Sequence, residues 1–227
     1  MIKVGITGRS GFIGSHLWNM MQTLPEKYEL VKFKRDYFSD NDSIDSFVRG
    51  CDVIVHLAGL NRHDSGSFLY ETNVKLASSL ISGLDRTNQK PHVIVSSSVH
   101  EKEESHYGKS KKKCRELFSG WAARSGAKFT GLLLPNVFGP FGKAHYNSVV
   151  ATFCDQLTNS QTPKIYEDSS LELVYVGEVA ECIQECIDNQ VNDHRYNVRP
   201  SAVQKVHWYI TCSIVSGICA STIPDKF

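Results

Sequence analysis

The sequence has little net charge, no long hydrophobic run and no spaced pairs of cysteines. Its 227 residues carry 25 Lys and Arg against 24 Asp and Glu, a formal net charge of +1 at pH 7. This balance argues against a surface that binds nucleic acid or a membrane through bulk electrostatics. No hydrophobic run is long enough to span a bilayer. We therefore expect no nucleic-acid partner and no membrane partner.

The cysteines do not suggest a disulfide framework or a metal site. There are 7 of them, an odd number, scattered without Cys-x-x-Cys spacing, and the 9 histidines are dispersed as well. This distribution favours reduced thiols, and it offers neither metal-ligand spacing nor a Cys/His pair suited to thiol catalysis. The N-terminus enters a strand pattern directly, without the cationic and apolar regions of a signal peptide. We expect a cytoplasmic protein without a metal ion.

Strand patterns and helix patterns alternate along the first part of the chain. The expected strands cover residues 2–7, 30–33, 53–59, 93–98 and 129–134, and the expected helices cover residues 15–23, 68–84 and 107–124. Alternation at this interval predicts an α/β fold, a doubly wound, Rossmann-like parallel sheet with right-handed crossovers. Ligands of such sheets bind beyond the carboxyl ends of the strands. Gly8, Gly59, Ser98 and Pro135 all fall at those ends.

The regular alternation stops after Leu134. Residues 135–140 have loop chemistry, and a helix over 147–159, a strand over 171–176 and a helix over 179–187 follow at irregular spacing. We therefore expect a Rossmann core at residues 1–134 and a small, irregular, substrate-binding subdomain at residues 135–227, interleaved with the core. The tail from Val203 is apolar and poorly patterned. A docking segment is one interpretation of it.

A glycine-rich loop follows the first expected strand and opens the first expected helix. Gly8 suits a tight turn, Gly11 the close approach of a pyrophosphate, and Gly14 close packing of the helix. The helix N-terminus presents N–H groups and a partial positive charge to phosphates. This order predicts a dinucleotide cofactor. Its expected contacts in the two loops are Gly8, Arg9, Gly11, Phe12, Ile13, Gly14, Leu57, Ala58 and Gly59.

The end of the second expected strand bears on the choice of cofactor. An NAD-preferring site usually has an acidic residue there to hold the ribose hydroxyls. This chain has Lys34 and Arg35 instead, and Arg9 stands in the glycine loop. Because cationic side chains suit a phosphate dianion, we expect a 2′-phosphate pocket and a preference for NADP(H). Asp36 is close enough to leave NAD(H) open.

The stretch from Val93 to Lys111 carries the expected chemistry. A buried strand ends in three serines, Ser96 to Ser98, and Tyr107 and Lys111 then lie one turn apart on a helix. A free phenol is too weak an acid to exchange protons readily near neutrality. A neighbouring ammonium favours the phenolate and moves such a group towards the range of a general acid or base. We therefore expect a proton-transfer set at this place.

Together these residues resemble the extended short-chain dehydrogenase/reductase family. The matching features run from the start of the chain to about Val191. They are Thr7-Gly8-x-x-Gly11-Phe12-Ile13-Gly14, His56-Leu57-Ala58-Gly59, Asn73, the serine cluster, Tyr107-x-x-x-Lys111 and Pro135-Asn136-Val137-Phe138-Gly139. The resemblance implies an NAD(P)-dependent oxidoreductase. Asn73 would be either a surface residue or a buried amide that ties neighbouring strands together.

Two further stretches resemble a narrower group within that family. They are Leu134 to Gly139 followed by Tyr146 to Cys154, and the short loop between Ser98 and Tyr107. Both are similar to the reductases of capsule and O-antigen sugar synthesis that make UDP-2-acetamido-2,6-dideoxy-L-talose, on the route to UDP-N-acetyl-L-fucosamine. Members of that group carry a C-terminal cupin domain that epimerises the sugar. A truncation, a fragment and a natural single-domain form are all open for this chain, and we expect a homodimer.

The resemblance implies a role for each site residue. Tyr107 would protonate the carbonyl oxygen of a UDP-sugar while NADPH delivers hydride to the carbon, and Lys111 would support the phenolate and hold the nicotinamide ribose. Ser98 would hydrogen-bond the carbonyl, with Ser97 as the alternative if the strand ends one residue sooner. The hydride chemistry belongs to the cofactor. The other implied contacts are Pro135 with the cofactor and Asn136 and Asn147 with the UDP-sugar.

Two other functions compete with the reductase. A nucleotide-sugar 4-epimerase or dehydratase with tightly held NAD could use the same triad, but an internal redox cycle needs no external NADPH. Lys34 and Arg35 therefore favour the reductase. A non-enzymatic dinucleotide-sensing scaffold would predict an incomplete triad, whereas Ser98, Tyr107 and Lys111 are all present.

Overall fold

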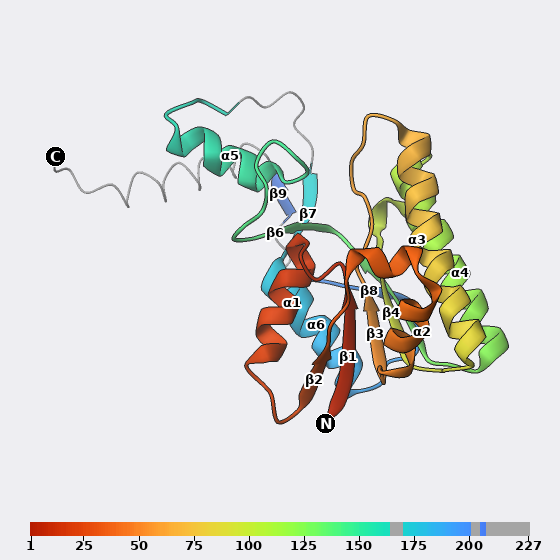
Figure 1. Ribbon diagram of the computed structural model, residues 1–227. Helices are drawn as coiled ribbons and strands as arrows, with labels where there is room; N and C mark the ends of the chain where they lie inside the picture. The colour runs from red at the N-terminus through yellow and green to blue at the C-terminus, as the bar shows by residue number, and fades with distance from the viewer. Residues whose placement is uncertain (164–169, 201–204, 208–227) are drawn as a thin grey trace. The chain divides into compact units, whose positions relative to one another are not determined.

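The computed structural model describes residues 1–163, 170–200 and 205–207 (Figure 1). The chain divides into two compact units. The first comprises Met1–Leu134 and Val179–Val198, and the second comprises Pro135–Glu178 together with the residues from Arg199 onward. The chain therefore leaves the first unit after Leu134 and returns to it over residues 179–198.

The first unit is built on a parallel sheet of six strands in the order β2-β1-β3-β4-β5-β8. The strands are β1 (Ile2–Thr7), β2 (Tyr28–Val31), β3 (Val53–His56), β4 (His92–Ser98), β5 (Phe129–Leu134) and β8 (Asp193–Asn197). The central strands β3, β4 and β5 are buried on both faces, so hydrophobic and polar residues do not alternate along them. The predicted doubly wound α/β fold is confirmed.

Helices cover both faces of this sheet, with α1 and α6 on one face and α2, α3 and α4 on the other (Figure 1). Two 3-10 helices, η1 and η2, lie in the loops that follow β2 and β4. The helix bounds are α1 (Phe12–Gln22), η1 (Arg35–Ser39), α2 (Asn41–Arg49), α3 (Gly66–Thr87), η2 (Val99–Lys102), α4 (His106–Ser125) and α6 (Val176–Asp188).

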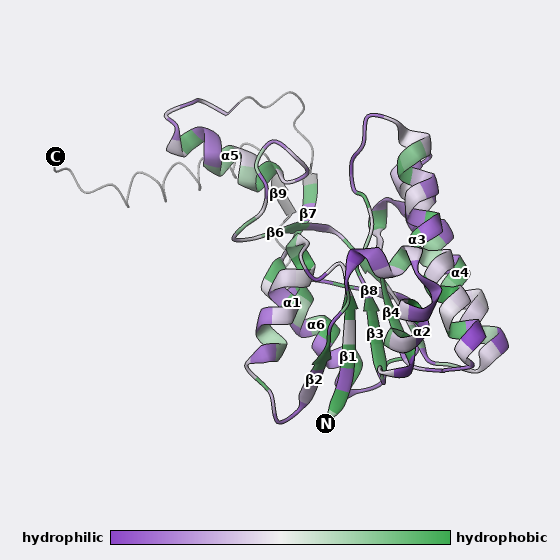
Figure 2. Cartoon of the chain, in the orientation of Figure 1, coloured by the Kyte–Doolittle hydropathy of each residue, from purple (hydrophilic) through white to green (hydrophobic). Residues whose placement is uncertain are grey.

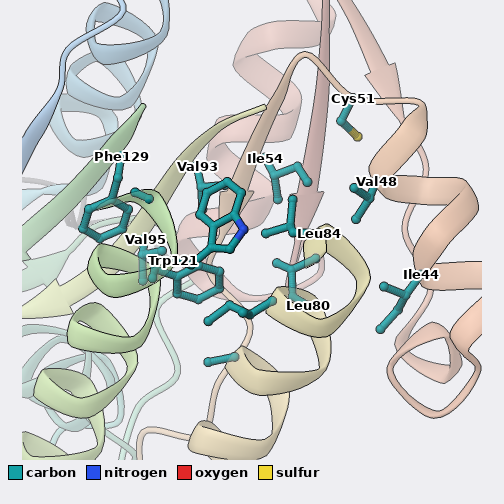
Figure 3. Close-up of a cluster of buried hydrophobic side chains, with 14 of the residues drawn as sticks. Ile44, Val48, Cys51, Ile54, Leu80, Leu84, Val93, Val95, Trp121 and Phe129 are labelled. Atoms are coloured by element: carbon teal, nitrogen blue, oxygen red, sulfur yellow. The ribbon is translucent and has the colours of Figure 1, made fainter. Parts of the chain in front are cut away.

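The larger hydrophobic core lies between the sheet and helices α2, α3 and α4. Figure 2 shows the central strands as hydrophobic, whereas hydrophilic residues are spread along these helices. The helices bury one face each against the sheet, which is the usual source of helix stability in a domain of this kind. Figure 3 shows side chains from the three helices meeting those of the sheet, among them Ile44, Val48, Leu80, Leu84, Trp121, Ile54, Val93 and Phe129.

The second unit contains helix α5 (Val149–Thr158) and a sheet of three short strands in the order β6-β7-β9. The strands are β6 (Asn136–Phe138), β7 (Ser170–Tyr175) and β9 (Lys205–His207). Strand β6 is parallel to β7, and β9 is antiparallel to it. The expectation of a loop over residues 135–140 was wrong, because three of those residues pair with β7. The apolar tail from Val203 lies outside the described residues except for β9.

Several elements of the first unit were not predicted from the sequence: η1, α2, η2 and β8. Strand β8 is short and mostly exposed, so it has no hydrophobic pattern that could identify it. None of the helices in the described part of the chain combines the length and the hydropathy that a membrane crossing requires. The same residues contain no group of three His, Cys, Asp or Glu side chains that could hold a metal ion.

Candidate active site

The glycine loop makes a tight turn between β1 and α1. Gly8 has a φ of 77°, the left-handed region that side chains rarely adopt, and a Cβ there would lie 2.7 Å from the backbone nitrogen of Ala58. The Gly11 N–H donates to the Gly8 carbonyl at 2.9 Å. The loop therefore folds back on itself and packs against the residues that follow β3. The turn expected at Gly8 is present.

The N-terminus of α1 has no side-chain cap. Its N-cap residue is Gly11, and its first turn has no acidic residue. Helices α2, α3 and α4 instead use the side chains of Asp40, Ser65 and Ser105 to accept a backbone N–H. The first amides of a helix have no partner within the helix. The amide dipoles at the start of α1 are therefore left for an external acceptor such as a phosphate.

The cationic side chains expected to hold a 2′-phosphate stand after β1 and β2, which are neighbouring strands. Lys34 is the N-cap of η1 and Arg35 is its first residue, and both side chains are exposed. Arg9 is exposed as well, with its guanidinium carbon 4.8 Å from the centre of the Trp18 ring. The structure therefore places all three cations in loops at one end of the sheet.

Asn73 of α3 fixes the loop that follows β3. Its Oδ1 accepts the Leu60 N–H at 2.6 Å, and its Nδ2 donates to the Leu60 carbonyl and to Ser110 Oγ, both at 3.0 Å. Asn73 is thus the buried amide that the resemblance left open. It ties a loop to helix α4 rather than one strand to another. The predicted cofactor-contact residues Leu57, Ala58 and Gly59 lie in the segment that leads into this bond.

His56, at the end of β3, is neutral and structural. Its Nδ1 lies 2.9 Å from Thr7 Oγ1, and burial together with the charge of Lys111 lowers the pKa of His56 to about 3. An imidazole with such a pKa is uncharged near neutral pH. His56 therefore does not compete with Lys111 as a cation in this part of the molecule.

The three serines of β4 point to different partners. Lys111 Nζ donates to the Ser96 carbonyl at 3.1 Å and lies 3.4 Å from Ser96 Oγ. Ser97 Oγ donates to the carboxylate of Glu101 at 2.9 Å, and Ser98 Oγ accepts the N–H of His100 at 3.2 Å. Because side chains alternate along a strand, Ser98 shares the face of Ser96, on which Lys111 lies. Ser97 faces the other side.

Tyr107 and Lys111 lie together on the first turns of α4. Lys111 Nζ is 5.8 Å from the centre of the Tyr107 ring, and Lys111 is 8% exposed. Ser105 caps the helix by accepting the Gly108 N–H, which sets where the helix starts relative to Tyr107. Tyr107 is half-buried. The structure thus brings Tyr107, Lys111 and Ser96 into one cluster, whereas Ser97 and Ser98 bond to Glu101 and His100.

A buried ion pair lies beside this cluster and was missed in the sequence. Glu101 of η2 accepts from Arg115 of α4, with Nε at 2.8 Å and Nη2 at 3.0 Å. Burial alone would raise the pKa of the Glu101 carboxyl, but the hydrogen bonds from Arg115 and Ser97 outweigh it and hold that pKa below its usual range. One signal was available in the sequence: Arg115 follows Lys111 by four residues and so falls on the same buried face.

Three of the predicted binding residues belong to the second unit. Pro135 is buried, Asn136 begins β6, and Asn147 is exposed just before the N-cap of α5. The loop that holds Asn147 is pinned by His145, whose N–H donates to Thr152 Oγ1 at 2.9 Å. Their contacts with a cofactor or a sugar stay predictions.

Comparison with known proteins agrees with this fold. CapF from Staphylococcus aureus, described as a capsular polysaccharide assembling protein, superposes with a TM-score of 0.80 at 24% identity, over 97% of this chain and 58% of that chain. RMD from Pseudomonas aeruginosa, solved with NADPH, superposes with a TM-score of 0.81 at 18% identity, over 97% of this chain and 82% of that chain. At these identities the likeness shows the fold alone.

A curated relative is more similar in sequence. The UDP-2-acetamido-2,6-beta-L-arabino-hexul-4-ose reductase of Pseudomonas aeruginosa is 29% identical over 195 residues, which is 85% of this chain and 51% of the relative. The chain therefore spans about half the length of the curated relative that it matches. The profile of the NAD dependent epimerase/dehydratase family matches residues 4–198. The chain belongs to this family, and the resemblance drawn from its motifs is confirmed.

Proposed function

We propose that this chain reduces the ketone of a 4-keto-6-deoxy UDP-amino sugar with NADPH. The observation that carries the proposal is the placement of Lys111, which β4 holds through Ser96 beside the ring of Tyr107. A buried ammonium next to a half-buried phenol is suited to general acid catalysis at a carbonyl. The same sheet presents a glycine loop and an uncapped helix start, which fit a dinucleotide pyrophosphate.

Each residue of the cluster has one task in the proposed reaction. When bound, NADPH supplies the hydride that the ketone carbon receives. Tyr107 donates its proton to the carbonyl oxygen, and the Lys111 ammonium stabilises the phenolate that is left. Ser98 donates a hydrogen bond to the same oxygen and so orients the ketone. We assign this role to Ser98 rather than Ser97, because Ser97 Oγ donates to Glu101.

The preference for NADPH rests on charge. Lys34 and Arg35 are exposed at the strand that adjoins β1, and neither forms a salt bridge with another described residue. They are therefore available to a 2′-phosphate. A guanidinium can also stack on an adenine ring, so Arg9 above Trp18 is a further candidate for the adenosine end.

The substrate class rests on the similarity to the curated reductase, whose name specifies a UDP-linked, 2-acetamido-substituted 4-ketohexose. We propose that Asn136 and Asn147 orient such a sugar, and that the product serves capsule or O-antigen synthesis. A homodimer, a cytoplasmic location and a cupin domain on the complete protein are further proposals of the same kind.

An NAD-dependent nucleotide-sugar 4-epimerase or dehydratase is the second candidate. Asp36 favours it, since it is an acidic residue in the first turn of η1, near the position where NAD-binding sheets hold the ribose hydroxyls. Such an enzyme returns its cofactor to the starting state, so it consumes no nicotinamide. The reductase consumes one NADPH for each sugar reduced.

The test is a turnover assay on the whole chain. A UDP-2-acetamido-4-keto-6-deoxyhexose is added with NADPH or with NADH, and the loss of reduced cofactor is compared with the amount of UDP-2-acetamido-6-deoxyhexose formed. UDP-N-acetylglucosamine, which has no ketone, serves as the matched control. We expect one-to-one consumption with NADPH and slower turnover with NADH. Conversion of UDP-N-acetylglucosamine without added cofactor, or NAD that co-purifies with the protein, would establish the second candidate instead.

A further inference from the structure

We infer that the buried pair Glu101–Arg115 positions the groups that touch the ketone, and that turnover depends on it although neither side chain meets the substrate. The inference rests on the proposed function of Tyr107 and Ser98. It assigns a role to a buried ion pair that takes no direct part in the proposed reaction.

Glu101 and Arg115 form a buried, bidentate pair. Glu101 Oε2 accepts from Arg115 Nε at 2.8 Å and from Ser97 Oγ at 2.9 Å, and Oε1 accepts from Arg115 Nη2 at 3.0 Å. Oε1 also forms an ion pair with Arg195 Nη1, at 2.8 Å. The side chains of Glu101 and Arg115 are only 2% and 7% exposed. The bidentate bond to Arg115 and the bond from Ser97 together fix the orientation of the carboxylate. The pair therefore fixes the elements that carry it.

Those elements are the ones that carry the reacting groups. Ser97 precedes Ser98 on β4, Glu101 lies on η2 between β4 and α4, and Arg115 lies on α4 two turns after Tyr107. Tyr107, Lys111 and Arg115 are spaced by four residues and share one face of the helix. Glu101 is thus bonded both to the strand that ends in Ser98 and to the helix that begins with Tyr107.

Two glycines show that the contact is sterically built into the fold. A Cβ on Gly131 of β5 would lie 2.8 Å from Arg115 Cδ, so the glycine leaves the space that the arginine side chain needs. A Cβ on Gly108 would lie 2.2 Å from the carbonyl oxygen of His100. The backbone of η2 therefore rests directly on α4 at the residue after Tyr107. A displacement of η2 is passed to the phenol through this contact.

A small displacement is enough to affect the rate. Catalytic groups act within narrow distance limits, and a misplacement of about 1 Å can cost about 100-fold in rate. The hydrogen bonds and ion pairs that Glu101 and Arg115 form with described residues join them to each other and to Ser97, His194 and Arg195, none of which lies in the glycine loop. We therefore expect cofactor binding not to depend on the pair in the same way. A loss of turnover at constant cofactor affinity is the expected signature of a positioning residue.

The experiment compares three variants of the whole chain. Arg115→Lys keeps the charge but loses the bidentate bond, and Ser97→Ala removes one donor with little disturbance of the buried charges. Arg124→Lys is the matched control, because Arg124 lies on the same helix and pairs with Asp85 on the surface. For each variant kcat, KM for the keto sugar, Kd for NADPH and the folded fraction by circular dichroism are measured.

We expect kcat to fall about 10- to 100-fold in Arg115→Lys and about 3- to 10-fold in Ser97→Ala, with Kd for NADPH within about two-fold of the wild type. The control keeps wild-type kcat. Wild-type kcat in both test variants overturns the inference. A parallel loss of kcat, NADPH affinity and folded fraction overturns it as well, because the pair would then be merely structural; if Arg115→Lys does not fold, Ser97→Ala decides.

Tyr107→Phe, measured alongside, separates this inference from the proposed function. Wild-type turnover in Tyr107→Phe contradicts the proposed function and removes the basis of the inference. An inactive Tyr107→Phe together with fully active Arg115→Lys and Ser97→Ala contradicts the positioning role alone.

Discussion

The two regions of the first unit that flank the expected ketone site are built in opposite ways. The glycine loop after β1 is shaped by backbone alone: a left-handed Gly8, a helix without a side-chain cap, and exposed cations nearby. The region where β4, η2 and α4 meet is shaped by buried side chains whose bonds are made within the protein.

The difference indicates a division of labour. Unmet backbone N–H groups and exposed cations are completed by a ligand, so the glycine loop contributes affinity for the cofactor. Buried charged groups that already have partners need no further reorganisation when the substrate binds. The region where β4, η2 and α4 meet therefore contributes to kcat. Changes in the first region should alter Kd, and changes in the second should alter kcat.

The largest expected effect is the loss of the acid. Tyr107→Phe keeps the ring that lies beside Lys111 but removes the proton, so we expect kcat to fall about 1,000-fold, within the range of general acid catalysis. Kd for NADPH should stay within about two-fold, measured by fluorescence titration. Tyr70→Phe on α3 is the control and should behave as the wild type.

Such a result would show that the Tyr107 hydroxyl contributes to kcat and not to the affinity for NADPH. If Tyr107→Phe instead lost cofactor affinity and kept its kcat, Tyr107 would belong to the cofactor region, and the division of labour would be wrong.

The next effect concerns the shape of the glycine loop. Gly8→Ala forces a side chain into the left-handed region and brings Cβ to 2.7 Å from the Ala58 nitrogen. Gly126→Ala is a matched control, because Gly126 has a φ of 74° but nothing lies within 4 Å of its Cβ. We expect Gly126→Ala to cost only the conformational strain, about 1–2 kcal/mol in urea unfolding, and Gly8→Ala to cost more and to weaken NADPH binding.

Equal losses of stability in the two variants, with NADPH binding intact, would show that Ala58 shifts to make room for the new Cβ and that this shift does not affect cofactor binding. The close approach between the glycine loop and the end of β3 would then not define the cofactor region.

The glycine loop after β1 could be predicted from the sequence because its signals are local. A glycine at a left-handed turn, a helix start without a capping residue and a buried hydrophobic strand are each visible within a few residues. Alternation then predicted the five strands and three of the four α-helices in residues 2–134, and it missed α2. The same reasoning found Tyr107 and Lys111, which lie one turn apart on one helix.

The region where β4, η2 and α4 meet could not be predicted in the same way, because its hydrogen bonds and ion pairs join residues that lie far apart in the sequence. Nothing near Glu101 shows that Arg115 will reach it, and Arg195 comes from a strand too short and too exposed to be predicted. Ser97 and Ser98 were distinguishable only once the bond between Ser97 and Glu101 was known. Strand β6 was missed because only its pairing with β7 identifies it.

A smaller effect is expected at the adenosine end of the cofactor region. Arg35→Ala removes a cation that we expect to contact the 2′-phosphate, and a hydrogen bond to a charged group contributes roughly 1.5–3 kcal/mol. We therefore expect Kd for NADPH to rise at least about ten-fold and Kd for NADH to stay unchanged. Lys32→Ala, which removes an exposed cation just before the buried Phe33, should change neither. Equal weakening of both cofactors would mean that Arg35 does not contact that phosphate.

The smallest expected effect is a pH dependence of stability, and it concerns only the region where β4, η2 and α4 meet. The pKa of Glu101 is held below its usual range in the folded protein by its bonds to Arg115 and Ser97, in spite of burial. Its contribution to stability is therefore fully present above the unfolded pKa of about 4.3, and it is lost as the pH falls through the lower, folded pKa. Glu101→Gln should be less stable than the wild type near neutrality, and the gap should narrow below about pH 4.3 in urea titrations.

Glu104→Gln is the matched control for that titration, because Glu104 lies in the same loop and pairs with Lys109, yet its side chain is 92% exposed. Surface ion pairs of this kind contribute little, so Glu104→Gln should follow the wild type at every pH. A gap for Glu101→Gln that stays constant down to the acid limit would show that the carboxylate charge is not what stabilises the η2 loop. In that case shape, rather than charge, would hold the loop, and the two regions would differ less than their contacts suggest.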